Sequence, residues 1–444
     1  MSRLTADKIE RVSALLTSLP GDMAERMCAA ARGGDPALGR LLDYCRAGPD
    51  AAARIRFFEP VACVSGEPGK ARPSRAYAPP GLQTSLWRWL SEIAPGPVEA
   101  AQEAAADFDG AEPGRLDSAR VQAADAIEAA LKAGEADPKA AKKLRARLGV
   151  DGFEPVRHLA SLLRASPVTR TALTGLPDVI ADFSDDLSAS VRDRYEAASD
   201  ADPDAAVWVL FLVMARMDRP WRLLRVFERI ARREDDLLVS RTDMAEIGDA
   251  LLRDAEHHLR GFAAPPMSDE EAAAAARALS EFAAVTVGMT REIGIRKDGA
   301  WGKRLFELRN RASEHMAAIH EAAREAIKRA TPEEGGVRVR VKTPPRPGEE
   351  GYERAVSLGR FLVASKDEAS RAAVGNAHLA VIEEMQARLE SLGDTLLATI
   401  RSGAASERES AAMRLEDVAG LMRAVGAEES AEVFLRRVAA ARAA

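Results

Sequence analysis

The pattern of hydrophobic and polar positions is most distinctive in residues 202–233, DPDAAVWVLFLVMARMDRPWRLLRVFERIARR. An Asp-Pro pair opens this stretch, and aspartate at the N-cap followed by proline at the first helical position is typical of a helix start. Every residue of 205–215 is then apolar. A helix that is apolar on all sides must be surrounded by other helices or by lipid, and this run spans only about 16 Å, roughly half a bilayer core. We therefore predict a buried central helix here.

A second, amphipathic helix is predicted from Pro220 onward, with an apolar inner face and arginines on its outer face. Residues 216–233 contain seven arginines but only Asp218 and Glu228 as acids. Four of the arginines have the 3-4-3 spacing that places them along one helix face: Arg222, Arg225, Arg229 and Arg232. Such a stripe could bind phosphates, acidic lipid headgroups or an acidic partner protein. The alternative is a solvated face whose arginines pair with neighbouring acids.

Most of the remaining chain shows helical periodicity interrupted by Pro and Gly, which predicts an all-α fold. Val337–Lys342 is the one segment with convincing strand-like alternation. We expect a multi-helix body of stacked helical hairpins followed by a long C-terminal antiparallel helical hairpin. The predicted regions are an N-terminal helical region at 1–110 with a long Pro/Gly loop at 59–81, a central helical domain at 115–265, and a C-terminal region at 268–444.

The C-terminal region carries two heptad-like stripes, which predict the two arms of the hairpin around a tip at 331–349. The first stripe comprises Trp301, Leu305, Leu308, Ala312, His315, Ile319 and Ala322. The second is a possible interaction seam formed by Ile382, Met385, Leu389, Leu392 and Leu396. A terminal helix pair follows the second arm. Since a two-helix pair covers its flanks thinly, we expect this hairpin to contact a partner protein or a second copy of the chain.

Composition and charge set limits on this picture. A net charge of −6, with 30% charged residues, indicates a mixed-sign surface, so nucleic acid is a possible but not the favoured partner. Three cysteines, Cys28, Cys45 and Cys63, have spacings that match neither a zinc site nor a disulfide framework, and we expect buried free thiols. The sequence shows no signal-peptide pattern and no apolar run of about 20 residues, so a cytoplasmic protein without a transmembrane segment is expected.

Candidate chemistry is sparse in the sequence. The loop at 65–71 lacks the first glycine and the Ser/Thr of a phosphate-binding loop. The aspartate pairs at 185–186 and 235–236 lack the third carboxylate that a divalent metal site needs. Asp254 and His258 share a helix face, but no second ligand pair accompanies them. We therefore predict no catalytic, metal or cofactor site.

We expect a non-enzymatic helical scaffold or adaptor that mediates protein–protein interaction. The alternative is a regulator that binds nucleic acid or an anionic surface through the arginine-lined helix. A third possibility is an all-α metal-dependent enzyme. An exposed apolar groove would favour the first, contiguous unpaired arginines the second, and a deep pocket with converging carboxylates the third.

Overall fold

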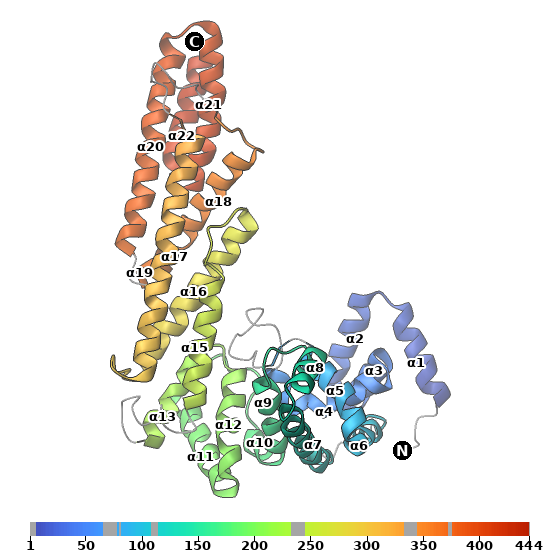
Figure 1. Cartoon of the computed structure of the whole chain (residues 1–444). Helices are drawn as coiled ribbons and strands as arrows, with labels where there is room; N and C mark the ends of the chain where they lie inside the picture. Colours follow the sequence, from blue (N-terminus) through green and yellow to red (C-terminus); the bar gives the residue numbers. More distant parts are fainter. Residues whose placement is uncertain are drawn as a thin grey trace. The chain divides into compact units, whose positions relative to one another are not determined.

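The chain is all-α in the computed structural model, which describes residues 6–64, 78–79, 81–107, 114–231, 245–332, 344–371 and 375–443. Over these ranges there are α-helices and short 3₁₀ turns but no strand (Figure 1). The predicted fold class is thus confirmed. The predicted strand at 337–342 lies outside the described residues. The chain divides into two compact units, Met1–Arg233 and Glu234–Ala444, and each is described by itself.

The first unit contains thirteen described α-helices and two 3₁₀ turns. They are α1 (Ala6–Ser18), α2 (Gly21–Gly34), α3 (Pro36–Ala47), α4 (Pro49–Phe58), η1 (Glu59–Val64), α5 (Leu82–Ile93), α6 (Pro95–Ala105), α7 (Asp117–Glu135), α8 (Pro138–Leu148), α9 (Glu154–Arg164), α10 (Ser166–Leu173), α11 (Asp185–Ala201), α12 (Pro203–Arg216), η3 (Pro220–Leu223) and α13 (Leu224–Ala231).

Aspartate–proline pairs start several of these helices, as the sequence predicts. Asp35, Asp137 and Asp202 each have extended backbone and accept hydrogen bonds from amides of the first helical turn, and a proline follows each of them. The side chain therefore satisfies an amide that has no partner within the helix, while proline occupies a position that needs no N–H.

Helix α12 is the buried centre of the first unit. Leu210 and Val213 are fully buried, and Trp208, at the edge of the run, packs its ring on Phe211 with 5.7 Å between centroids. The helix contacts α11, α10, α9 and both 3₁₀ turns, so neighbours cover it on several sides. This arrangement explains why no polar face is present in its sequence.

Two local predictions for the first unit need correction. Residues 59–64, predicted as the start of a long loop, form the 3₁₀ turn η1, in which Val61 and Val64 are buried. Pro220 begins the 3₁₀ turn η3 rather than an α-helix, and α13 starts only at Leu224. Pro220 and Leu223 are both buried in this tighter turn, where side chains three residues apart lie on the same side.

The second unit is a helical bundle, in which α20, α21 and α22 run side by side (Figure 1). Its helices are α15 (Ala245–Arg260), α16 (Asp269–Glu292), α17 (Ala300–Ala330), α18 (Glu350–Ala364), α19 (Lys366–Arg371), α20 (Gly375–Ser402), α21 (Ala405–Ala424) and α22 (Glu428–Ala443).

This bundle contains more helices than the predicted two-arm hairpin, and that hairpin arrangement is not confirmed. Helices α17 and α20 do contact each other, but α17 packs more extensively on α18, and α20 on α21. Helix α15, predicted in the central domain, packs on α16 and α17 and belongs to the second unit. The additional helices supply the cover that two arms alone would lack. The middle of the predicted tip, 333–343, lies outside the described residues.

Candidate functional site

The predicted arginine stripe is interrupted at its start. Arg222 lies in the 3₁₀ turn η3, and its Nη1 is 2.7 Å from the Asp182 carboxylate. Arg225 lies on α13, is half-buried and also has an interaction within the protein. The side chain of Arg229 and the whole of Arg232 lie outside the described residues. The two described members are therefore held by the protein rather than forming the contiguous free stripe that polyanion binding requires.

The predicted interaction seam is mostly internal to the second unit. Ile382, Met385, Leu389 and Leu396 are buried, and only Leu392 is partly exposed. The neighbouring Gly393 lies against Phe434 of α22, where an added Cβ would overlap the ring. Most of these side chains lie in the core of the bundle, and Leu392 and Leu396 also line a cavity of about 450 Å³. Self-association through this region stays a prediction.

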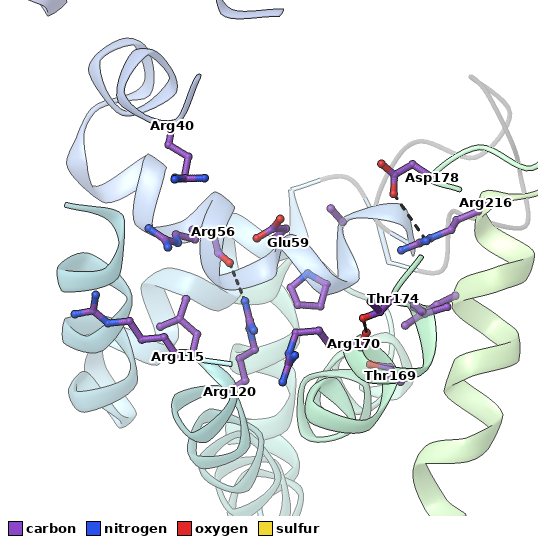
Figure 2. A pocket seen from close by; sticks show the side chains of 15 residues that line it. Arg40, Arg56, Glu59, Arg115, Arg120, Thr169, Arg170, Thr174, Asp178 and Arg216 are labelled. Carbon is purple, nitrogen blue, oxygen red and sulfur yellow. Dashed lines mark hydrogen bonds and ion pairs between the residues drawn. The ribbon is translucent and has the colours of Figure 1, made fainter. Parts of the chain in front are cut away.

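The structure brings together a different set of arginines, which the sequence does not reveal. They surround a cavity of about 540 Å³ in the first unit (Figure 2). We call it the arginine cavity. Its lining residues are Arg40, Arg56, Glu59, Pro60, Ala62, Arg115, Leu116, Arg120, Thr169, Arg170, Leu173, Thr174, Asp178, Leu212 and Arg216.

Arg120 ties two helices together at the base of the cavity. Only 3% of it is exposed. From α7 its Nε donates to the Phe57 carbonyl at 2.9 Å and its Nη2 to the Arg56 carbonyl at 3.0 Å. Both carbonyls lie in the last turn of α4, where no amide of the helix itself is available to them. Arg120 thus caps α4 from a neighbouring helix.

Asp117 orients two of the cavity arginines. One carboxylate oxygen accepts from Arg120 Nη1 at 3.2 Å, and the other accepts from Arg170 Nε and Nη2 at 3.1 and 2.8 Å. Helices α7 and α10 are therefore linked through a largely buried carboxylate. Such bonds are charge-assisted and hold the planar guanidinium groups in fixed directions.

The remaining arginines line the outer parts of the cavity. Arg56 donates to the Ala104 carbonyl in the last turn of α6 and to the Asp107 carbonyl just after that helix. Arg115 pairs with Asp107 at 2.5 Å. Arg216 lies 3.8 Å from Asp178, and its Nη1 is 3.4 Å from the Leu176 carbonyl. In Figure 2, Arg115 and Arg216 lie at opposite ends of the site, with Glu59 between them.

Burial disfavours the charged form of two cavity arginines, Arg120 and Arg56. Burial lowers the pKa of Arg120, with Asp117 and Glu59 acting in the opposite direction. Burial also lowers the pKa of Arg56, and the nearby Arg40 cation adds to that effect. Guanidinium groups stay charged at neutral pH because their ordinary pKa is so high. Arg120 and Arg56 are therefore incompletely solvated cations, and a bound anion would offset their charge.

The sequence candidates for metal binding lie elsewhere. Asp185 and Asp186 are exposed in the first turn of α11, and Asp254 and His258 are buried on α15. Among the described residues, no group of three or more His, Cys, Asp or Glu side chains is placed to hold a metal ion. Asp235 and Asp236 lie outside the described ranges, as does the loop at 65–71. Cys28 and Cys45 are buried free thiols, as predicted.

Sequence reasoning also missed a buried histidine pair in the second unit. His320 Nε2 lies 3.0 Å from His378 Nδ1, and His378 Nε2 lies 2.7 Å from the Leu362 carbonyl. That carbonyl can only accept, so His378 carries its proton on Nε2 and accepts from His320. The heptad spacing places His315 and His378 on the predicted seams; His378 is buried there, whereas His315 is only partly buried and His320 takes its place in the core.

Comparison with protein-family models, with curated proteins and with solved structures finds no match for this chain. Within the described part of the chain, no helix is both long and apolar enough to cross a membrane. The arrangement of side chains is therefore the basis for a functional proposal.

Proposed function

We propose that the chain is a non-catalytic binding protein whose first unit recognises an anionic group in the arginine cavity. The observation that carries the proposal is the convergence of six arginines on one cavity of about 540 Å³. Two carboxylates, Glu59 and Asp178, accompany them in its lining. Asp117 and Asp107 pair with three of these arginines from outside the lining, so six cations face four carboxylates. The site therefore keeps an excess of positive charge in a chain whose net charge is −6. This relocates the predicted anion-binding role from the arginine stripe to residues that are distant in sequence.

The arginines are suited to this role because the protein already holds several of them in place. A guanidinium has five N–H donors, and a carboxylate or carbonyl partner occupies only some of them. The same side chain can thus bind a protein acceptor and a ligand oxygen. Since Arg120 and Arg170 are fixed by Asp117, they lose little conformational freedom when a ligand binds. The volume of about 540 Å³ is in the range of small-molecule sites, so it can admit an anionic group.

The chemistry of the lining supports binding rather than catalysis. Arginine does not give up its proton in proteins, so it cannot act as a general base. It does form bidentate bonds with phosphate and carboxylate groups. Of the three predicted functions, the metal-dependent enzyme would need converging carboxylates, whereas the charge of this cavity favours an anion.

The test is calorimetric titration of the full-length chain with inorganic pyrophosphate at low ionic strength. We expect saturable binding that weakens as salt is added, because screening reduces charge–charge attraction. Arg40→Gln and Arg115→Gln should each weaken binding by about tenfold, or about 1.4 kcal/mol. Neither residue is fully buried, so both variants should fold. Arg147→Gln is the matched control, since Arg147 pairs with Glu92 outside the cavity.

Glu59→Gln should change the affinity for pyrophosphate in the opposite direction. Glu59 lines the cavity, and its negative charge acts on Arg56 and Arg120. Removing that charge should tighten pyrophosphate binding severalfold. Absence of binding by the wild-type chain at low salt would overturn the proposal. So would binding that is the same in wild type, Arg40→Gln and Arg115→Gln.

The scaffold or adaptor role stays a second candidate because of exposed apolar residues in the first helices. Leu15 on α1, Met23 on α2 and Leu38 on α3 are 57%, 52% and 45% exposed. Large apolar side chains at the surface are typical of contacts with another protein when they are contiguous. A triple glutamate variant at these positions should lose proteins that the wild-type chain captures from native cells. Identical capture by both chains would contradict this role.

A further inference from the structure

A second cavity adjoins the arginine cavity in the first unit. Its volume is about 340 Å³, and it shares Arg40, Arg56 and Glu59 with the arginine cavity. Helices α3, α4 and α6 supply its other walls. The residues that it adds are Asp43, Tyr44, Ala52, Ile55 and Ala105.

The two cavities differ sharply in charge. The arginine cavity is lined by six arginines, with Glu59 and Asp178 as its acids. In the second cavity the two shared arginines are balanced by Asp43 and Glu59. An anion that enters the pair of cavities is therefore attracted toward the arginine cavity. The second cavity offers no net positive charge to hold it.

The two cavities also differ in apolar surface. Of the five residues that only the second cavity contains, four are aliphatic or aromatic. Ile55 is 57% exposed although it directly precedes the half-buried Arg56 on α4. Ile55 is thus an exposed apolar side chain beside the arginine cavity. Covering such a side chain with an apolar group lowers the free energy of the complex. Tyr44 adds an aromatic ring, which lies partly in the small core formed by α1, α2 and α3.

We propose that the two cavities form one site for an organic phosphate ester. Its phosphate binds in the arginine cavity, and its apolar body lies against Tyr44 and Ile55. This inference rests on the proposed function and names its ligand class. Arg40, Arg56 and Glu59 stand where the phosphate joins the body, because they line both cavities. Each cavity is of the size found in small-molecule sites.

The test compares inorganic phosphate, phenyl phosphate, butyl phosphate and uncharged phenol by calorimetric titration of the full-length chain. Phenyl phosphate should bind at least tenfold more tightly than inorganic phosphate, and phenol alone should not bind measurably. A preference for phenyl over butyl phosphate would indicate an aromatic body, and the reverse an aliphatic one. Either order supports the inference.

Ile55→Gln isolates the contribution of the apolar cavity. It should reduce the preference for the better ester over inorganic phosphate to threefold or less, and leave the affinity for inorganic phosphate unchanged. Because Ile55 is exposed, this variant should fold normally. Leu38→Gln is the matched control, since it replaces an exposed apolar residue of α3 that lines neither cavity.

The outcomes separate this inference from the proposed function. Equal affinity for inorganic phosphate and both esters would overturn the inference and leave anion binding in place. The same conclusion would follow if Ile55→Gln kept the full preference, because the ester body would then lie elsewhere. Binding of neither inorganic phosphate nor the esters would overturn both.

Discussion

Replacing Arg120 by alanine should destabilise the first unit by about 3–5 kcal/mol. The wild-type side chain is almost completely buried and donates to the carbonyls of Phe57 and Arg56 and to the carboxylate of Asp117. Alanine removes the guanidinium donor from both carbonyls. Hydrogen bonds that involve a charged group contribute about 1.5–3 kcal/mol each. Asp117 keeps its two bonds to Arg170, so its charge is still compensated and its contribution to the loss is smaller.

The expected loss is large because folded domains are stable by only about 5–15 kcal/mol in total. Urea unfolding followed by tryptophan fluorescence can measure it. Trp87 is a suitable reporter, since its ring centroid lies 5.6 Å from that of Phe57, directly beside the lost contacts. Four of the five tryptophans lie in the first unit, so its unfolding dominates the signal.

Two further variants make the result interpretable. Arg120→Lys keeps a cation but not the fork of donors, so it should fall between wild type and alanine. Arg147→Ala removes an exposed arginine of the same unit and should change the midpoint little. If Arg120→Ala lowers the free energy of unfolding by less than about 1 kcal/mol, the reasoning is refuted. Water would then satisfy the carbonyls nearly as well as the guanidinium does.

Three other predictions concern both units. The pKa of His320 is lowered to about 4 by burial, and burial also lowers that of His378, whereas an unfolded imidazole titrates near 6.5. Between the folded and unfolded pKa values, the unfolded chain binds more protons than the folded chain. The urea midpoint of the second unit should therefore fall as the pH drops from 7 to 5. A midpoint that does not change with pH would contradict this prediction. Gly248→Ala should lower the melting temperature, at a cost of about 1–3 kcal/mol, because its Cβ would overlap the Trp301 ring. An unchanged melting curve would mean that the ring shifts freely. Leu210→Asp places a charge at a fully buried position of α12 and should abolish soluble expression, so a soluble, folded variant would disprove the central role of this helix.

Local signals in the sequence were strong enough to predict helices and their starts. Asp202 and Pro203 begin α12 as expected, because the cap acts on amides only two or three residues away. The apolar run after them predicts burial on all sides for a similarly local reason. These features depend on a few neighbouring residues, so they can be recognised without the rest of the fold.

It is harder to predict from the sequence which residues of a long helix face the core. A strict 4-3-4-3 stripe through α17 is correct for its other five members but also places His315 and Ala322 inward. At those two points the structure buries Met316, His320 and Ala323 instead. An α-helix has about 3.6 residues per turn, so a 3.5-residue repeat drifts by about 20° per heptad unless the helix supercoils. Packing on α18 and α20 decides which side of the drifting stripe is covered.

The sequence by itself determined the helical class, the capped helix starts and the buried α12. The tertiary structure alone decided the candidate site. Its arginines are spread from Arg40 to Arg216 with no regular spacing, and they meet only because α3, α4, α7, α10 and α12 pack around one cavity. Spacing along a chain reports which residues share a helix face, but it carries no information about groups on different helices. The physical property that matters here, concentrated charge with incomplete solvation, exists only after those helices have packed.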